Sequence, residues 1–251
     1  MRRMVLVAAA AVACTALVGC GADLGMPPAA TRTAADVHQV WRVFVYAGAA
    51  IAVLVYALLV WVLVRHRRRR DDRAIPRQTR ELPWLEITYT AIPFVIVVAL
   101  FLVVFPVNER IQQVSARSDM TLEVEGFDWS WRFTFPGEAG ADGQPLEVVG
   151  TPSRPPQISL PLGATVHVVV RSADVAHSFY VRDWLFKKDA IPGQVNEFDV
   201  ELTAAGLQEG QCAEFCGLDH ARMRFGIDVV EPDAYRDWVR SQTPATAGTT
   251  P

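Results

Sequence analysis

The chain has 251 residues, of which 51% are hydrophobic and 20% charged, so it is long enough for one or two domains. Its formal net charge of −3 conceals an asymmetry: residues 1–107 carry 12 Lys+Arg and 6 Asp+Glu, whereas residues 108–251 carry 12 and 21. The acidic C-terminal part argues against nucleic-acid binding and suits a basic partner.

The N-terminal stretch MRRMVLVAAAAVACTALVGC predicts an export signal. It has a basic start, an apolar run that is too short for a membrane span, and small residues before Cys20. Leu17–Cys20 resembles a bacterial lipobox, so we expect a signal peptide at residues 1–19 and lipidation of Cys20. The alternative is an ordinary signal sequence, or one that is not cleaved, with an incidental cysteine.

Two apolar runs predict transmembrane helices. Residues 43–64 contain no charge, and residues 87–107 form a second run of similar length. About 20 apolar residues suffice for a helix to cross the hydrocarbon core. Tryptophans near the ends of these runs suit the membrane interface: Trp41, Trp61 and Trp84. Pro93 inside the second run predicts a kink.

The connection between the two runs carries eight arginines from Arg65 to Arg80. By the positive-inside rule this loop is cytoplasmic, which places both mature termini and the domain that follows on the extracytoplasmic side of a bacterial cell membrane. A patch for nucleic acid or anionic lipid is the alternative reading. Glu86, at the start of the second span, is either functional or a partner of the helix dipole.

From Met120 onward, short β-rich runs separated by Gly, Pro and Asp favour an all-β sandwich or barrel. The expected strands are Thr121–Val124, Trp129–Phe135, Gln157–Leu160, Thr165–Arg171, Ser178–Val181, Glu197–Leu202 and Arg224–Val230. Residues 138–145 are expected to form a loop, and a short helix is expected after Pro232. We expect the tail, residues 241–251, to be disordered.

The stretch QCAEFCGLDHARM places Cys212, Cys216, His220 and Met223 in one short segment. His177, in DVAHSF, can join them if two loops meet at one end of a sandwich. A disulfide would explain the two thiols alone. Zinc takes Cys2His2 sets but seldom a thioether. Copper can use all five donors, because thiolate and thioether are soft and imidazole suits copper.

Two thiolates exceed the needs of one blue-copper ion. Two sulfurs that bridge two copper ions, each with one histidine, account for the whole set. Met223 can complete one copper, and a backbone carbonyl between the cysteines can complete the other. Such a site has no evident open position for a substrate, so the pattern indicates electron transfer.

The segment C-x-E-x-C-G-x-x-H-x-x-M from Cys212 to Met223 resembles the binuclear copper A signature of cytochrome c oxidase subunit 2. Four other stretches agree with this family in order: LEITYTAIP (85–93), DWSW (128–131), DVAHSF (174–179) and KKDAIPGQ (187–194). The resemblance covers roughly residues 36–235. It implies an α+β membrane protein, with an N-terminal two-helix transmembrane hairpin followed by an all-β cupredoxin-like Greek-key sandwich.

The implied domains are residues 20–107 for the N-terminal segment and hairpin and residues 108–240 for the external copper domain. Matched positions imply copper ligation by His177, Cys212, Cys216, His220 and Met223, together with the backbone carbonyl of Glu214. The resemblance assigns the Glu214 carboxylate to a magnesium ion shared with subunit 1. It also assigns Trp129 to electron acceptance from cytochrome c and Glu86 to the mouth of a proton pathway into subunit 1.

The implied function is that of an oxidase subunit. Electrons pass from cytochrome c, or a c-type cytochrome domain, through copper A to haem in subunit 1, where oxygen is reduced to water and protons are pumped. Other oxidase subunits and membrane lipid are the further implied partners. No CxxCH motif occurs, so we expect no haem in this chain.

The chain departs from the family pattern at Asp128, where glutamine is common, at Phe127 before it, and at Gln194, where a basic residue is usual. These changes concern donor docking rather than the copper ligands. We weigh three rivals: a quinol-oxidase subunit without copper, a membrane-tethered copper-delivery protein and a nitrous-oxide reductase domain. The full ligand set argues against the first, DWSW and Glu86 against the second, and chain length against the third.

Overall fold

The computed structural model describes residues 24–67, 78, 80–115, 117–139 and 145–242. The predicted signal peptide, Cys20, most of the arginine-rich connection and the last nine residues lie outside the described residues. Contacts divide the chain into two compact units, which are described separately. One contains the residues up to His38 together with those from Glu109 onward, and the other contains Gln39–Asn108.

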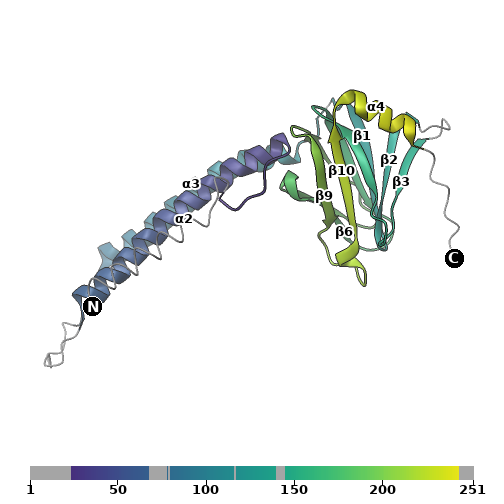
Figure 1. The fold of residues 1–251 in the computed structure, drawn as a ribbon. Coiled ribbons are helices and arrows are strands. Elements are labelled where there is room, and N and C mark those ends of the chain that lie inside the picture. Colours follow the sequence, from purple (N-terminus) through teal and green to yellow (C-terminus); the bar gives the residue numbers. More distant parts are fainter. Residues whose placement is uncertain (1–23, 68–77, 79, 116, 140–144, 243–251) are drawn as a thin grey trace, which may run out of the picture. The chain divides into compact units, whose positions relative to one another are not determined.

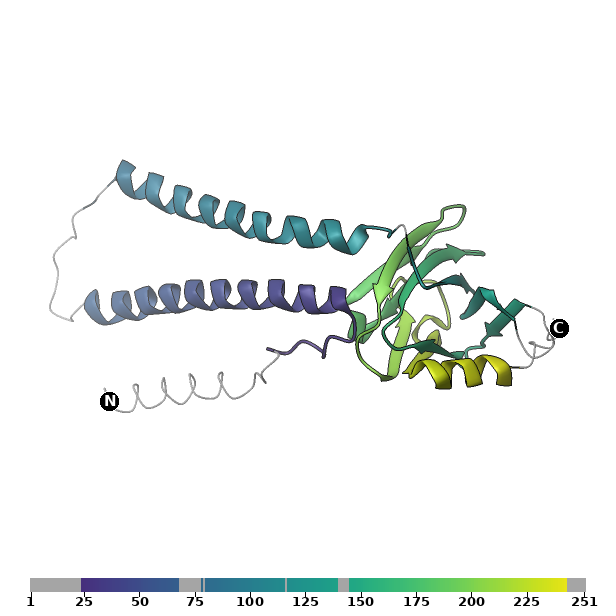
Figure 2. The same ribbon diagram turned by 90° about the horizontal axis from the view of Figure 1, so that it is seen from above.

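Two long helices, α2 (Arg32–Arg65) and α3 (Pro83–Gln112), supply the second unit and run in opposite directions (Figure 2). Each is long and apolar enough, by length and composition, to cross a membrane. Their apolar side chains are exposed along nearly the whole span. A continuous apolar surface of this kind requires lipid or another protein to cover it.

The helices extend beyond the apolar runs because polar residues at their ends also favour helix. Ala34 N–H donates to Thr31 Oγ1 at 3.1 Å, a helix-capping contact at the start of α2, which begins at Arg32, eleven residues before the apolar run at Val43. Pro83 begins α3, as suits a residue without a backbone donor. Pro93 and Pro106 both lie inside α3.

The segment before Gln39 packs with the strands of the first unit. Ala30 N–H donates to Asp183 O at 2.9 Å, and Ala30 O accepts from Thr203 N–H at 3.0 Å. Thr31 forms a β-bridge with Leu202. The structure therefore joins these residues to the β-domain, whereas the sequence grouped residues 20–107 with the hairpin.

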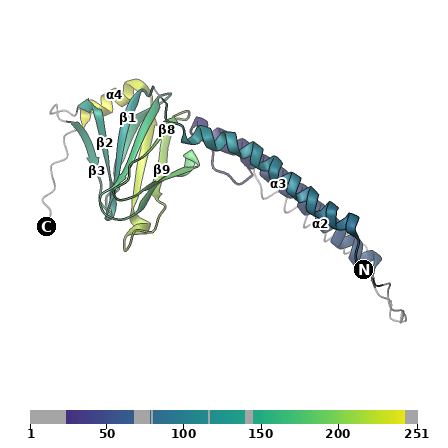
Figure 3. The same ribbon diagram turned by 180° about the vertical axis from the view of Figure 1, so that it is seen from behind.

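The remainder of the first unit is a β-sandwich followed by a short helix (Figures 1 and 3). Among the described residues, ten strands form two five-stranded sheets, in the orders β3-β2-β1-β5-β8 and β4-β10-β9-β6-β7. The first sheet consists of β1 (Met120–Phe127), β2 (Ser130–Ala139), β3 (Pro145–Val149), β5 (Thr165–Ser172) and β8 (Asn196–Glu201). The second consists of β4 (Gln157–Pro161), β6 (His177–Val181), β7 (Phe186–Ala190), β9 (Gly206–Cys212) and β10 (Arg224–Val230).

The seven predicted strands all occur, and β3, β7 and β9 are additional. The predicted loop at residues 138–145 is shorter than expected, because β2 continues to Ala139 and β3 begins at Pro145. The helix expected after Pro232 is α4 (Pro232–Ser241), and its Trp238 ring lies 5.6 Å from that of Phe135.

The core between the sheets is aromatic next to the predicted ligands. Phe179 of β6 stacks on Phe225 of β10, with ring centroids 4.8 Å apart, and Trp131 meets Phe225 edge-on at 5.5 Å. Gly210 makes this packing possible, because a Cβ there would lie 2.0 Å from the Phe225 ring. Phe179 lies two residues after His177 and Phe225 two after Met223, so the core fixes the strand ends that carry these side chains.

Candidate metal centre

Three neighbouring strands bring the predicted ligands together. His177 is the first residue of β6, Cys212 is the last of β9, and Met223 immediately precedes β10. Phe179 pairs with Cys212 across β6 and β9, which sets His177 near the end of β9. Cys212 N–H donates to Met223 O at 2.9 Å and closes the loop that contains Cys216 and His220.

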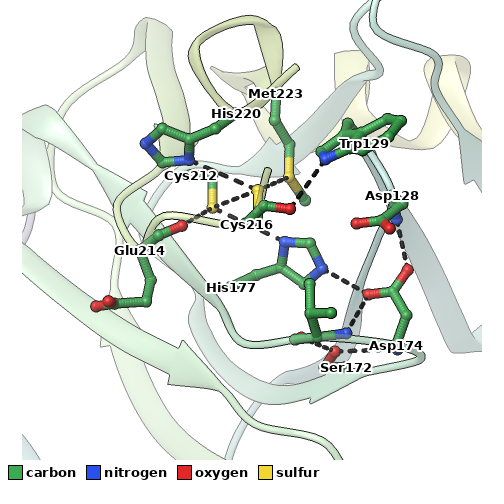
Figure 4. Close-up of polar contacts among 11 residues, drawn as sticks. Asp128, Trp129, Ser172, Asp174, His177, Cys212, Glu214, Cys216, His220 and Met223 are labelled. Atoms are coloured by element: carbon green, nitrogen blue, oxygen red, sulfur yellow. Dashed lines mark hydrogen bonds and ion pairs between the residues drawn. The ribbon is translucent and has the colours of Figure 1, made fainter. Parts of the chain in front are cut away.

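The donor atoms lie at separations that suit shared metal ions (Figure 4). The two Sγ atoms are 3.9 Å apart. Cys212 Sγ lies 3.9 Å from His177 Nδ1 and 3.2 Å from Glu214 O. Cys216 Sγ lies 3.6 Å from His220 Nδ1 and 3.8 Å from Met223 Sδ. Metal–sulfur bonds of about 2.3 Å and metal–nitrogen bonds of about 2.0 Å place two ligand atoms of one ion roughly 3–4 Å apart.

The donors are sheltered from solvent. His177, Cys212, Cys216 and Met223 are buried, and His220 is half-buried. Both cysteines are free thiols at a sulfur separation far beyond the roughly 2.05 Å of a disulfide. Two thiols, two imidazoles and a thioether form a soft set that fits copper better than zinc, which seldom binds a thioether.

The two thiols differ in pKa. Burial raises the pKa of Cys212, but hydrogen bonds from His177 and from backbone amides outweigh it and hold that pKa at about 7. Burial and the neighbouring Cys212 charge raise the pKa of Cys216 to about 12. Without metal, therefore, one thiolate is favoured and the second proton is retained. A metal ion that binds both sulfurs must displace the remaining proton.

His177 is held on its outer side by Asp174. Asp174 Oδ1 lies 2.8 Å from His177 Nε2, while His177 Nδ1 faces Cys212. Burial lowers the pKa of His177, but its contacts with Cys212 and Asp174 outweigh burial and raise that pKa overall. Burial raises the pKa of Asp174, but hydrogen bonds from His177 and from two backbone amides lower it overall.

Trp129 lies against the same loop. Its Nε1–H donates to Cys216 O at 3.0 Å, and its ring is half-buried. Gly217 follows Cys216 with φ at +119°, and a Cβ there would lie 3.0 Å from Trp129 Nε1. The loop therefore needs glycine at this position for both its backbone conformation and its approach to the indole.

The side chains of two other predicted site residues are not part of this donor cluster. Glu214 contributes its carbonyl to the cluster, whereas its half-exposed carboxylate lies 3.8 Å from Lys187 Nζ. Glu86 lies in the first turn of α3, in the other unit, where its Oε1 accepts from Leu82 N–H at 3.4 Å. Asp174, which precedes His177 in the same DVAHSF stretch, was not among the predicted site residues. Its only signal was a carboxylate three residues before a candidate ligand.

Comparison with known proteins identifies the family. The family model for the periplasmic domain of cytochrome c oxidase subunit II matches residues 152–230, and the model for its transmembrane domain matches residues 20–107. A probable cytochrome c oxidase subunit 2 of Streptomyces avermitilis is 35% identical over 249 residues, covering 86% of this chain and 78% of the relative. The chain belongs to the cytochrome c oxidase subunit II family.

A second Streptomyces relative agrees with this membership. A probable cytochrome c oxidase subunit 2 of Streptomyces coelicolor is 35% identical over 244 residues, covering 84% of this chain and 76% of the relative. The crystal structure of the periplasmic domain of subunit II of cytochrome oxidase from Bradyrhizobium japonicum is 29% identical. It covers 50% of this chain and 94% of that chain, with a TM-score of 0.44.

Family membership confirms three predictions. The chain is a membrane protein and a subunit of a haem–copper terminal oxidase, and its partners include oxidase subunits. Its apolar helices followed by a two-sheet sandwich fit the predicted cupredoxin-like fold class. The family also implies a copper A site, and the donor cluster supplies residues of the right chemistry for one.

Proposed function

We propose that this chain is the electron-accepting subunit of its oxidase. It takes electrons from cytochrome c, or a c-type cytochrome domain, at a binuclear copper A centre. It passes them to haem in subunit 1 for the reduction of oxygen to water, coupled to proton pumping. The observation that carries the proposal is the convergence of five soft or imidazole side chains and one carbonyl, with neighbouring donors 3.2–3.9 Å apart.

The residues that would hold copper are His177, Cys212, Cys216, His220 and Met223, with the carbonyl of Glu214. When bound, the two copper ions would supply one-electron redox chemistry. The chain's own residues hold these donors in a buried frame, so little reorganisation accompanies a change of charge. Trp129 joins this frame to the surface through its bond to Cys216 O, which supports its role as the electron-accepting aromatic.

A copper-delivery protein would need exchangeable, accessible donors. Here His177, Cys212, Cys216 and Met223 are buried, and no solvent-facing sulfur occurs in the described part of the cluster. This burial favours electron transfer over delivery. Asp128, Asp174 and Glu214 contribute negative charges around the cluster, one of them paired with Lys187, and such charges suit a basic cytochrome.

We propose that the Glu214 carboxylate is a magnesium ligand. The half-exposed carboxylate of Glu214 has Lys187 as its ion-pair partner at 3.8 Å. Magnesium is often bound through one or two carboxylates with several waters, so Glu214 fits as one ligand of an ion shared with subunit 1. We also propose that Glu86, in the first turn of α3, marks the entrance of a proton pathway into subunit 1.

The proposed topology has two spans and a cytoplasmic arginine-rich loop. It follows from the charge pattern of residues 65–80. Removal of residues 1–19 and lipidation of Cys20 would leave both mature termini and the copper domain, residues 108–240, on the extracytoplasmic side. We propose no haem in this chain.

The deciding experiment uses the full-length chain purified in detergent after copper loading under reducing conditions. Copper is counted per chain, and the electron paramagnetic resonance spectrum of the oxidised form is recorded. We expect two copper ions that share one unpaired electron. Met223→Leu should alter this spectrum, whereas Met120→Leu, which removes a thioether outside the cluster, should not. A single localised copper, or none, would overturn the proposal.

A further inference from the structure

Asp174 occupies the turn between β5 and β6, three residues before His177. Its carboxylate accepts three hydrogen bonds. Oδ1 accepts from His177 Nε2–H at 2.8 Å and from Val175 N–H at 2.6 Å, and Oδ2 accepts from Asp128 N–H at 2.6 Å. The side chain is 30% exposed, so most of it is enclosed by these partners. Figure 4 shows it between His177 and the Asp128–Trp129 turn.

We infer that Asp174 is the positioning residue of the copper centre: its two oxygens fix the His177 imidazole and the Trp129 turn in one frame. The inference rests on the proposed function. A hydrogen bond from Nε2–H to Asp174 leaves the lone pair of Nδ1 directed at Cys212, which selects the tautomer that can ligate a metal through Nδ1.

Packing leaves the imidazole little freedom in other directions. A Cβ at Gly126 would lie 2.9 Å from His177 Cδ2, so the β1 backbone presses directly on one side of the ring. Trp131 lies edge-on to it, with ring centroids 6.1 Å apart. These contacts restrict tilting, and the Asp174 bond resists rotation about the remaining torsion. The carboxylate is thus the polar constraint on a ring that is otherwise held by apolar contact.

The second oxygen extends the frame to Trp129. Asp128 N–H is bonded to Asp174, and the indole of the next residue is bonded to Cys216 O at 3.0 Å. The Asp128–Trp129 turn is therefore attached to the metal cluster at two points, once through His177 and once through Cys216. Loss of Asp174 should loosen the turn and the histidine together, although neither residue has been changed.

Asparagine at position 174 cannot make the same set of hydrogen bonds as Asp174. A carboxylate accepts at both oxygens, whereas an amide has one acceptor oxygen and one NH2 donor. In Asp174→Asn, either His177 Nε2–H or Asp128 N–H would therefore face another donor. The substitution also removes a negative charge beside His177. That charge stabilises the more positive, oxidised copper pair, so its loss favours the reduced form. We therefore expect the reduced form to be favoured about tenfold, a rise of about 59 mV for one electron.

The test compares wild type, Asp174→Asn and Asp174→Ala as full-length, copper-loaded chains in detergent. Asp228→Asn is the control, because it removes an exposed negative charge from β10 outside the site. Copper per chain, copper retention against a chelator, the paramagnetic resonance spectrum, the reduction potential and the salt dependence of reduction by cytochrome c are measured. We expect both Asp174 variants to lose copper affinity by about tenfold or more and to show altered spectra and higher potentials.

The outcomes separate this inference from the proposed function. A wild-type chain without two electron-sharing coppers refutes the proposed function itself. A normal wild type with Asp174→Asn unchanged in spectrum, potential and copper retention refutes the positioning role. A change confined to the salt dependence of reduction by cytochrome c would show that Asp174 is only a surface charge, which also refutes it. If Asp174→Ala does not fold, as judged by circular dichroism, the near-isosteric Asp174→Asn decides.

Discussion

The indole nitrogen of Trp129 donates a hydrogen bond to the carbonyl oxygen of Cys216 at 3.0 Å. A half-buried surface aromatic is thereby bonded to the backbone of a proposed copper ligand, although the two residues are 87 positions apart in the chain. This contact links the surface indole to the backbone of the buried Cys216, and a change at Trp129 should therefore affect the proposed electron acceptance before it affects copper binding.

We expect Trp129→Phe to slow reduction of the copper centre by cytochrome c by about tenfold, the scale typical of losing an outer partner of a metal ligand. Phenylalanine keeps a ring but cannot donate to Cys216 O. Stopped-flow absorbance measures the rate, and the copper spectrum of the variant should remain close to that of wild type. Trp238→Phe on α4 is the matched control. Equal reduction rates in Trp129→Phe and wild type would remove Trp129 from the electron path.

Gly210→Ala should destabilise the domain by more than about 1–3 kcal/mol, the usual cost of overpacking a core. The added Cβ would lie 2.0 Å from the Phe225 ring, which stacks on Phe179. Gly137→Ala is the control, because a Cβ there meets nothing within 4 Å. Thermal unfolding in detergent measures both variants. A midpoint shift no larger for Gly210→Ala than for the control would contradict this account of the core.

The two membrane spans and the donors from Cys212 to Met223 could be predicted because each has a strong pattern within a short stretch of sequence. The two spans are long apolar runs, and their helices extend through Arg65 and from Pro83 because flanking polar residues also favour helix. The donor set was predicted from Cys212 to Met223 because its spacing is local. His177 could be added because two loops can meet at one end of a sandwich, and the structure brings it to Cys212 through the pairing of Phe179 with Cys212 across β6 and β9.

The missed features depend on tertiary context. Strand β9 (Gly206–Cys212) alternates Gln208, Gly210 and Cys212 toward the core, so its inward residues are polar or small and give no β signal. The role of Asp174 depends on two partners, one of them a backbone amide on another strand pair. Such a contact is set by side-chain direction in the folded domain, and residue spacing alone does not reveal it.

The N-terminal segment should stabilise the copper domain. Thr31 is buried, forms a β-bridge with Leu202 and accepts from Ala34 N–H at the start of α2. Thr31→Ala should cost about 0.5–2 kcal/mol of stability, the range for loss of a helix cap. Arg32→Ala removes only an exposed pair with Glu201, and such pairs contribute about 0–1 kcal/mol. Urea unfolding measures the free energy of unfolding of both variants. A larger loss of stability for Arg32→Ala than for Thr31→Ala would contradict this account of Thr31.

Tyr235 should make stability depend on pH in the alkaline range. Burial raises its pKa most, and the nearby Glu138 carboxylate, to which its hydroxyl donates at 3.3 Å, raises it further. A raised folded-state pKa stabilises the fold fully below the unfolded value of about 10 and progressively less above it. Wild type should therefore lose this stabilisation as the pH rises above about 10, and Tyr235→Phe should lose less stability over the same range. Parallel stability curves for the two chains would contradict this.

Glu86→Gln should slow oxygen consumption by the assembled oxidase without removing copper. Glutamine can still accept from Leu82 N–H, so the start of α3 is retained, but it cannot exchange a proton. Removal of one acid–base group typically costs about 10²–10⁴-fold in the step it serves. Glu81→Gln, an exposed change nearby, is the control. Turnover, reduction of copper by cytochrome c and copper per oxidase are measured on the same preparation. Normal reduction with slow turnover supports the proton role, whereas loss of copper or unchanged turnover would limit Glu86 to the helix start.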